Sequence, residues 1–217
     1  MEQIDNPGRE RILSRIRSAL TKPAPQHAAM QAAQIFAPVF DPLARFQKEC
    51  TDNVAECILT PDSDATAENL RSLLQRIPSG EVYVQDAPVL RRIAEKSISG
   101  RPIRWSSEGP PNEASQATIT LAESLVASTG SVLVASCDGG RAASVIAPVH
   151  IVVAGQDQLE PDLDAALTHA RERGLAARNS FLCLITGSSR TADIEKILVL
   201  GAHGPRRLVV LLAQHLD

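Results

Sequence analysis

Three short turns built from small residues offer the groups best suited to hold an anion. They are Ser128–Ser131, Gly139–Arg141 and Thr186–Arg190. Glycine lets such turns expose backbone N–H groups, and the serine and threonine hydroxyls add further donors. Arg141 and Arg190 contribute guanidinium groups, whose planar fork suits a carboxylate or a phosphate. If the three turns share one edge of a sheet, they form a pocket for a small anionic ligand, such as a carboxylate or a phosphorylated or CoA-type compound.

The third turn has the more specific context. It follows the apolar run Phe181–Ile185, which predicts a buried strand, and apolar residues at helical spacing predict a helix over Thr191–Leu198. A strand, a tight turn and a helix N-terminus in this order favour an anion site. Simpler roles also fit, because Ser189 and Thr191 are good N-caps and glycine turns are common for their geometry alone.

The candidate ligand-binding residues are the polar and glycine residues of these turns and the ionisable groups near them. They are Thr129, Gly130, Ser131, Arg141, His150, Thr186, Gly187, Ser188, Ser189, Arg190, Thr191, Asp193 and His203. His150 precedes an apolar strand and His203 lies in the turn Gly201–Pro205, so either could instead be a structural hydrogen-bonding residue. Arg190 could pair on the surface with Asp193 or Glu195.

No catalytic residue or metal site is assigned. The sequence lacks the nucleophile-elbow pattern G-x-S-x-G, the dinucleotide pattern G-x-G-x-x-G and the Walker A pattern. Asp193, Glu195 and His203 could ligate a metal, but their spacing does not demand one. None of the four cysteines stands at C-x-x-C spacing, so no iron–sulfur or zinc site is expected in this chain and the thiols are expected to be reduced core residues.

Composition points to a soluble cytoplasmic protein. Of the 217 residues 44% are apolar and 22% charged, and the net charge of −3 gives no sign of a nucleic-acid partner. No apolar run is long enough to span a membrane, and no secretory signal begins the chain.

The order of elements predicts an α/β fold with a mostly parallel sheet in three layers. Strands at 54–59, 81–85 and 103–105 alternate with helices, as in a parallel sheet covered on both faces. After residue 110 the apolar runs have short joints, which favour antiparallel or bent strands. A basic amphipathic helix and a proline-rich arm over 1–39 precede the main domain, 40–217, and the helix could dock on a partner or on its own domain.

Longer stretches of sequence resemble a known family. A-S-T-G-S-V-L-V-A-S, P-V-H-I-V-V-A and I-T-G-S-S-R-T-A-D-I-E followed by G-A-H-G-P are similar to the lactate utilization protein C family (LutC/YkgG), which carries the LUD domain. The resemblance runs from about Ala117 to Leu212. It implies a fold like the NagB/RpiA/CoA-transferase group, related to the Rossmann type.

The resemblance also implies a function. It suggests a non-redox subunit of a cytoplasmic complex that oxidises L-lactate to pyruvate, where this chain binds a small anion or stabilises two iron–sulfur partner subunits. The alternative is a stand-alone enzyme acting on a sugar phosphate or an acyl-CoA, as other members of the fold group do. Many relatives carry a glutamate where this chain has Ser128, and that departure argues against a CoA-transferase mechanism.

Overall fold

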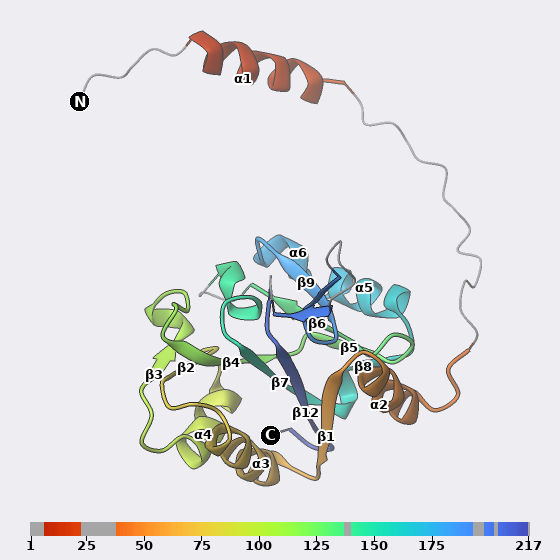
Figure 1. Cartoon of the computed structure of the whole chain (residues 1–217). Coiled ribbons are helices and arrows are strands. Elements are labelled where there is room, and N and C mark those ends of the chain that lie inside the picture. Colours follow the sequence, from red (N-terminus) through yellow and green to blue (C-terminus); the bar gives the residue numbers. More distant parts are fainter. Residues whose placement is uncertain (1–6, 23–37, 137–139, 193–197, 202–203, 217) are drawn as a thin grey trace. The chain divides into compact units, whose positions relative to one another are not determined.

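A computed structural model describes residues 7–22, 38–136, 140–192, 198–201 and 204–216. Contacts divide the chain into two compact units, Met1–Ile35 and Phe36–Asp217. The helices are α1 (Pro7–Leu20), α2 (Pro42–Asp52), α3 (Ser63–Gln75), α4 (Pro88–Ser97), α5 (Leu163–Glu172) and α6 (Leu175–Arg178), with 3-10 turns η1 (Ser106–Glu108), η2 (Gly140–Ser144) and η3 (Gln156–Gln158) (Figure 1).

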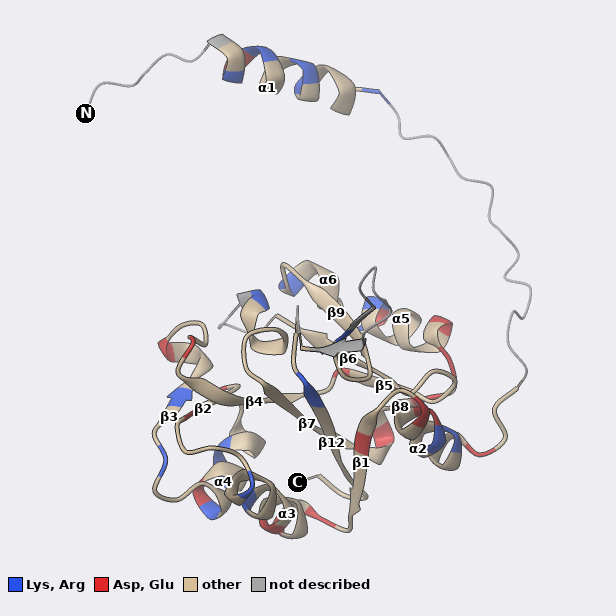
Figure 2. Cartoon of the chain, viewed as in Figure 1, with Lys and Arg blue, Asp and Glu red and all other residues tan. Residues whose placement is uncertain are grey.

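The first unit holds the helix α1. Ile12, Ile16 and Leu20 lie exposed along one side of it. Its arginines, coloured in Figure 2, give the helix the basic character expected from the sequence. Most of the expected proline-rich arm, over 23–37, lies outside the described residues.

The second unit is built on a parallel sheet, as the sequence predicts. Its order is β1-β12-β7-β4-β2-β3, and all its pairs run parallel. A second, mixed sheet has the order β8-β5-β6-β9. The strands are β1 (Ala55–Thr60), β2 (Glu81–Val84), β3 (Ile103–Trp105), β4 (Ser115–Leu121), β5 (Ser124–Val126), β6 (Ser131–Ala135), β7 (Val149–Gly155), β8 (Leu159–Glu160), β9 (Leu182–Thr186), β10 (Arg190–Ala192), β11 (Leu198–Leu200) and β12 (Arg207–Ala213).

Alternation along the central strands divides the core. Ile151 and Val153 of β7 face α3 and α4, while Val152 and Ala154 face α2 and the second sheet. The far side of the second sheet packs on α5 and α6 through a smaller cluster of Leu133, Ala170, Leu175 and Leu182. The parallel sheet is therefore covered by helices on one face and mainly by another sheet on the other.

One sequence prediction is wrong in this region, and another is confirmed as a strand but not as a buried one. The helix expected over Thr191–Leu198 is not formed at its ends, because Arg190–Ala192 and Leu198–Leu200 pair as the antiparallel strands β10 and β11. Leu198, the last residue of the expected helical face, begins the strand β11, and 193–197 lie outside the described residues. The strand expected to be buried over Phe181–Ile185 forms as β9, at an edge of the second sheet, where Leu184 is 41% exposed.

Candidate functional site

Two of the three predicted turns come together, at the amino end of the parallel sheet. Ser131 Oγ lies 2.7 Å from Thr129 Oγ1 and 2.6 Å from Thr186 Oγ1, so the three hydroxyls form a chain. Asn53, which caps α2, donates from its amide to Thr129 O at 3.1 Å and faces Arg190 at 3.5 Å. We refer to Asn53, Thr129, Ser131, Thr186 and Arg190 as the hydroxyl patch.

The glycines of these turns serve close packing on the end of α2. A Cβ on Gly130 would lie 2.7 Å from Cys50 N, and one on Gly187 would lie 2.0 Å from Asn53 O. Both residues have positive φ, at 62° and 75°. Ser188 is buried, where its hydroxyl donates to Val54 O at 2.7 Å and accepts from Leu208 N at 3.2 Å. Gly130, Gly187 and Ser188 therefore have structural roles at this point.

Replacing Gly187 by alanine should destabilise the fold by about 3 kcal/mol, because left-handed strain adds to an overlap with the backbone of Asn53. Gly174→Ala is the matched control, since Gly174 has φ 65° and a Cβ added there would have no neighbour within 4 Å. It should lose only about 1 kcal/mol from strain. Urea unfolding of the full chain measures both, and equal losses would contradict the packing role of Gly187.

The positive potential of a helix N-terminus, which was expected to attract an anion at this patch, is not found there in the described residues. The predicted helix N-terminus after Arg190 is replaced by β10, whereas the end of α2 that meets the patch is a C-terminus with partial negative charge. Arg190 is exposed and complements that charge. Thr191 lies in the middle of β10, opposite Val199, and Asp193 and His203 lie outside the described residues. Ser189 donates its N–H to Pro205 O at 2.9 Å.

Arg141 lies at the opposite end of the strand pair β6–β9 from Arg190. In this antiparallel pair Ser131 is opposite Thr186 at one end, and Ala135 is opposite Leu182 at the other. Arg141 donates to Ser180 O at 3.2 Å and stacks on the Phe181 ring at 5.3 Å. The single pocket imagined for all three turns therefore does not form.

Arg141 instead borders a pocket between the two sheets, which we call the inter-sheet pocket. Its polar lining comes from β4, η2, β9 and the end of β6, namely Thr120, Ser136, Arg141, Ser144 and Cys183. The enclosed part has a volume of about 10 Å³, close to that of one water molecule. A larger ligand would therefore bind at the mouth, beside Arg141.

His150 lies directly behind this pocket. Its Nε2 is 2.8 Å from Thr120 Oγ1, and its ring is fully buried. Within the described part of the chain, Nδ1 has no hydrogen-bond partner. Burial lowers the pKa of His150 to about 4, so the imidazole is neutral at physiological pH. His150 thus fixes the Thr120 hydroxyl without adding charge.

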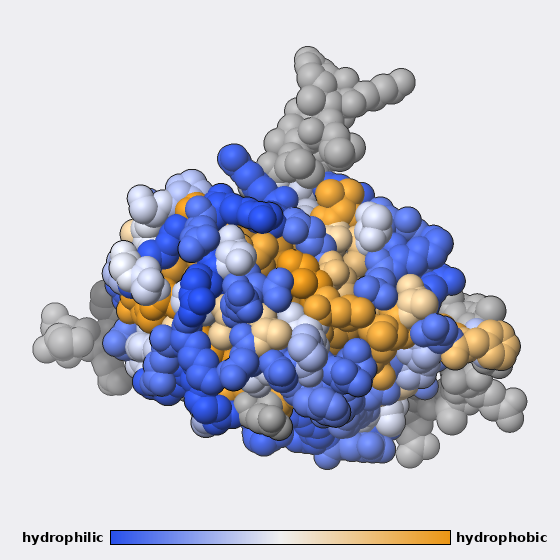
Figure 3. Space-filling view, turned by 90° about the horizontal axis from the view of Figure 1, so that it is seen from below, coloured by the Kyte–Doolittle hydropathy of each residue, from blue (hydrophilic) through white to orange (hydrophobic). Residues whose placement is uncertain are grey.

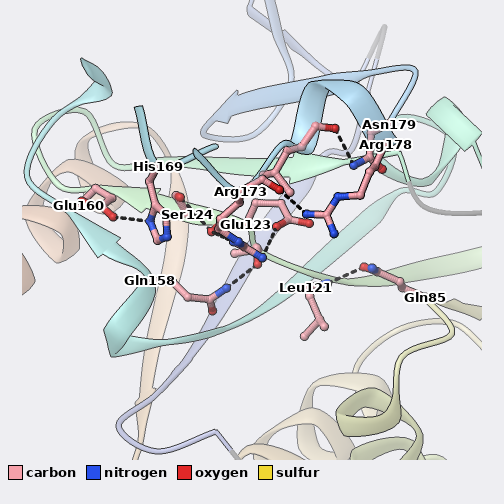
Figure 4. Close-up of polar contacts among 12 residues, drawn as sticks. Gln85, Leu121, Glu123, Ser124, Gln158, Glu160, His169, Arg173, Arg178 and Asn179 are labelled. Carbon is pink, nitrogen blue, oxygen red and sulfur yellow. Dashed lines mark hydrogen bonds and ion pairs between the residues drawn. The ribbon is translucent and has the colours of Figure 1, made fainter. Parts of the chain in front are cut away.

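The carboxyl end of β4 leads into a second polar network (Figure 4). Leu121 N donates to Gln85 Oε1 at 2.9 Å, and Gln158 donates to Ala122 O at 2.6 Å. Glu123 pairs with Arg173 at 3.1 Å. The carboxylate of Glu123 is therefore engaged in an ion pair within this network.

A metal site is not evident in the part of the chain that the structure covers. Among those residues, no three histidine, cysteine, aspartate or glutamate side chains gather as metal ligands, and no helix is long and apolar enough to cross a bilayer.

Comparison with known proteins finds a matching domain and similar proteins. Residues 111–213, which include every polar residue of the inter-sheet pocket, match the LUD domain. Lactate utilization protein C of Bacillus subtilis is 29% identical over 71% of both chains. The chain is therefore similar to proteins named lactate utilization protein C and carries a LUD-domain match over residues 111–213. The uncharacterized protein YkgG of Escherichia coli is 23% identical over 74% of both chains.

A solved structure of this LUD-domain family supports the fold. The crystal structure of a DUF162 family protein from Deinococcus radiodurans superposes with a TM-score of 0.58 over 79% of this chain and 96% of that one. The two sequences are 20% identical, so the likeness concerns the fold alone.

Of the sequence-predicted residues, Arg141 lines the inter-sheet pocket, and His150 lies behind it, in contact with the lining residue Thr120. Sequence reasoning missed Thr120, Ser136, Ser144 and Cys183, which come from separate elements. Thr120 had one usable signal, because a threonine in the middle of an apolar strand calls for a hydrogen-bond partner.

Proposed function

We propose that this chain takes part in lactate utilization as a component that binds a small carboxylate and carries no redox cofactor of its own. The observation that carries the proposal is its match, along 71% of its length, to a Bacillus subtilis protein named Lactate utilization protein C. The inter-sheet pocket supplies the chemistry, because hydroxyl donors and a guanidinium converge there.

The carboxylate would lie at the mouth of the pocket, between Arg141 and the hydroxyls. Arg141 uses one N–H on Ser180 O and retains others for a carboxylate oxygen. If His150 Nε2 carries the ring proton and donates it to Thr120, the Thr120 hydroxyl proton is left to point into the pocket. In this arrangement a neutral His150 orients the Thr120 hydroxyl toward the ligand.

The same geometry favours binding over acid–base catalysis. A general base works best with a pKa near the working pH, whereas the pKa of His150 is lowered to about 4. Its Nε2 is engaged with Thr120, and the ring is fully buried. We therefore assign His150 a positioning role and no catalytic one.

The proposal includes partners. We propose that the redox chemistry belongs to two iron–sulfur proteins that assemble with this chain in the cytoplasm, as the family resemblance implies. The face shown in Figure 3 carries an apolar stripe among hydrophilic side chains, and exposed apolar surface of this kind is typical of interaction sites. The basic helix α1 offers another element for docking.

Growth tests the proposal. A clean deletion of the gene should abolish growth on L-lactate as the sole carbon source, and the wild-type gene in trans should restore it. A tagged copy should co-purify with two iron–sulfur proteins. Normal growth of the deletion strain on L-lactate would overturn the proposal, and turnover of a sugar phosphate or an acyl-CoA by the purified chain alone would favour a stand-alone enzyme.

A further inference from the structure

Thr120 is the contribution of the parallel sheet to the inter-sheet pocket. It lies on β4 and is 3% exposed, whereas the other lining residues belong to or flank β6, η2 and β9. Arg141 is exposed. The enclosed part of the pocket, about 10 Å³, has room for one group the size of a water molecule. A carboxylate that pairs with Arg141 at the mouth can therefore place one further small group inside.

His150 sets the direction in which the Thr120 hydroxyl can donate. The two residues lie on neighbouring parallel strands, His150 Nε2 is 2.8 Å from Thr120 Oγ1, and the ring is fully buried. Its Nδ1 has no hydrogen-bond partner in the described part of the chain. A proton on Nδ1 would leave a buried N–H donor unpaired, an arrangement that folded proteins almost always avoid. The ring proton therefore belongs on Nε2.

The inside of the pocket is consequently rich in hydrogen-bond donors. With the ring proton on Nε2, His150 donates to Thr120 Oγ1, and the Thr120 proton is available to a ligand. Among the described residues that line the pocket, none carries a carboxylate or an amide side chain. The other polar side chains of the lining can all donate, and they are Ser136, Arg141, Ser144 and Cys183.

We infer that Thr120 is the specificity-determining residue of this pocket and that it selects 2-oxo acids over 2-hydroxy acids, with His150 as its positioning residue. An oxo oxygen carries only lone pairs, so donors alone satisfy it. A 2-hydroxyl group must also place its own proton, for which the donor-rich lining is poorly suited. The inference rests on the proposed carboxylate site and adds that this site holds pyruvate in preference to L-lactate.

The test is isothermal titration of the full chain with pyruvate, L-lactate and propionate. These ligands share a carboxylate and a three-carbon skeleton and differ in the group on the second carbon. Wild type should bind pyruvate roughly tenfold more tightly than either of the others, because each of those leaves a buried polar group imperfectly paired. Arg141→Ala is the control, since it should weaken all three ligands and keep their order.

Two variants separate specificity from structure. Thr120→Val removes the hydroxyl at nearly constant volume, so pyruvate should bind roughly tenfold more weakly while propionate binds as before. Thr120→Ser keeps the donor and should restore the preference for pyruvate. A purely structural role of Thr120 would instead change the three affinities alike.

The tautomer of His150 gives a second readout, which the ¹⁵N chemical shifts of its ring report in the full chain. The expected result is a proton on Nε2. A proton on Nδ1 would overturn the inference, as would equal affinities or a preference for L-lactate in a protein whose binding depends on Arg141. Each of these results leaves the proposed carboxylate site standing. If wild type binds none of the three ligands, the carboxylate site itself is wrong and the inference falls with it.

Discussion

Replacing Arg141 by alanine should weaken the binding of pyruvate or L-lactate by roughly ten- to a hundredfold, whereas Arg190→Ala should change it less than twofold. A charge-assisted hydrogen bond to a carboxylate contributes about 1.5–3 kcal/mol, which corresponds to that range. Arg141 borders a pocket with hydroxyl donors, while Arg190 is exposed beside the C-terminus of α2. Isothermal titration of each ligand into both variants measures the difference.

The two arginines form a matched pair. Each follows one end of the antiparallel strands β6 and β9, both are exposed, and each variant removes one positive charge. A general electrostatic effect would therefore weaken binding equally in both. Arg141→Lys keeps the charge but loses the fork, so it should recover little of the affinity. If only Arg190→Ala loses affinity, the ligand binds at the hydroxyl patch and the inter-sheet pocket is not the site.

The parallel sheet was predictable because its signals are local. Strands such as β2, between a helix end and the proline that starts α4, are bounded by turn residues that stand next to them in the sequence. The hairpin β10–β11 was missed because isoleucine and leucine at the right spacing suit either period, and the pairing of Arg190 with Leu200 is not visible locally.

The candidate site was only half predictable, for a different reason. The turns were recognised from their composition. Their positions, however, depend on which end of β6 and β9 each one follows, and the sequence did not show that these strands form a second, separate sheet. Thr120 and His150 come from neighbouring strands β4 and β7, thirty residues apart, and only the sheet order brings their side chains together.

Acid should destabilise this protein through His150. Its pKa is lowered from 6.5 to about 4 in the folded state, so the unfolded chain binds the proton more readily. The stability from the neutral imidazole is fully present above about pH 6.5 and is lost as the pH falls through 4. A shift of this size corresponds to about 3 kcal/mol between pH 7.5 and pH 4.

Urea unfolding of wild type and His150→Gln across this pH range tests the prediction, with the slope against pH as the readout. Arginine partners lower the pKa values of Glu56 and Asp86. These two groups therefore also make the protein less stable as the pH falls, but they do so equally in wild type and in the variant. Between pH 7.5 and pH 4, the free energy of unfolding should therefore fall by about 3 kcal/mol less in the variant than in wild type. This holds even if the variant is less stable at neutral pH. Thr120→Val removes the hydroxyl but keeps the buried ring, and it should retain the wild-type slope. Parallel curves for wild type and His150→Gln would show that His150 already takes up its proton in the folded state near pH 6.5, and that the ring is hydrated.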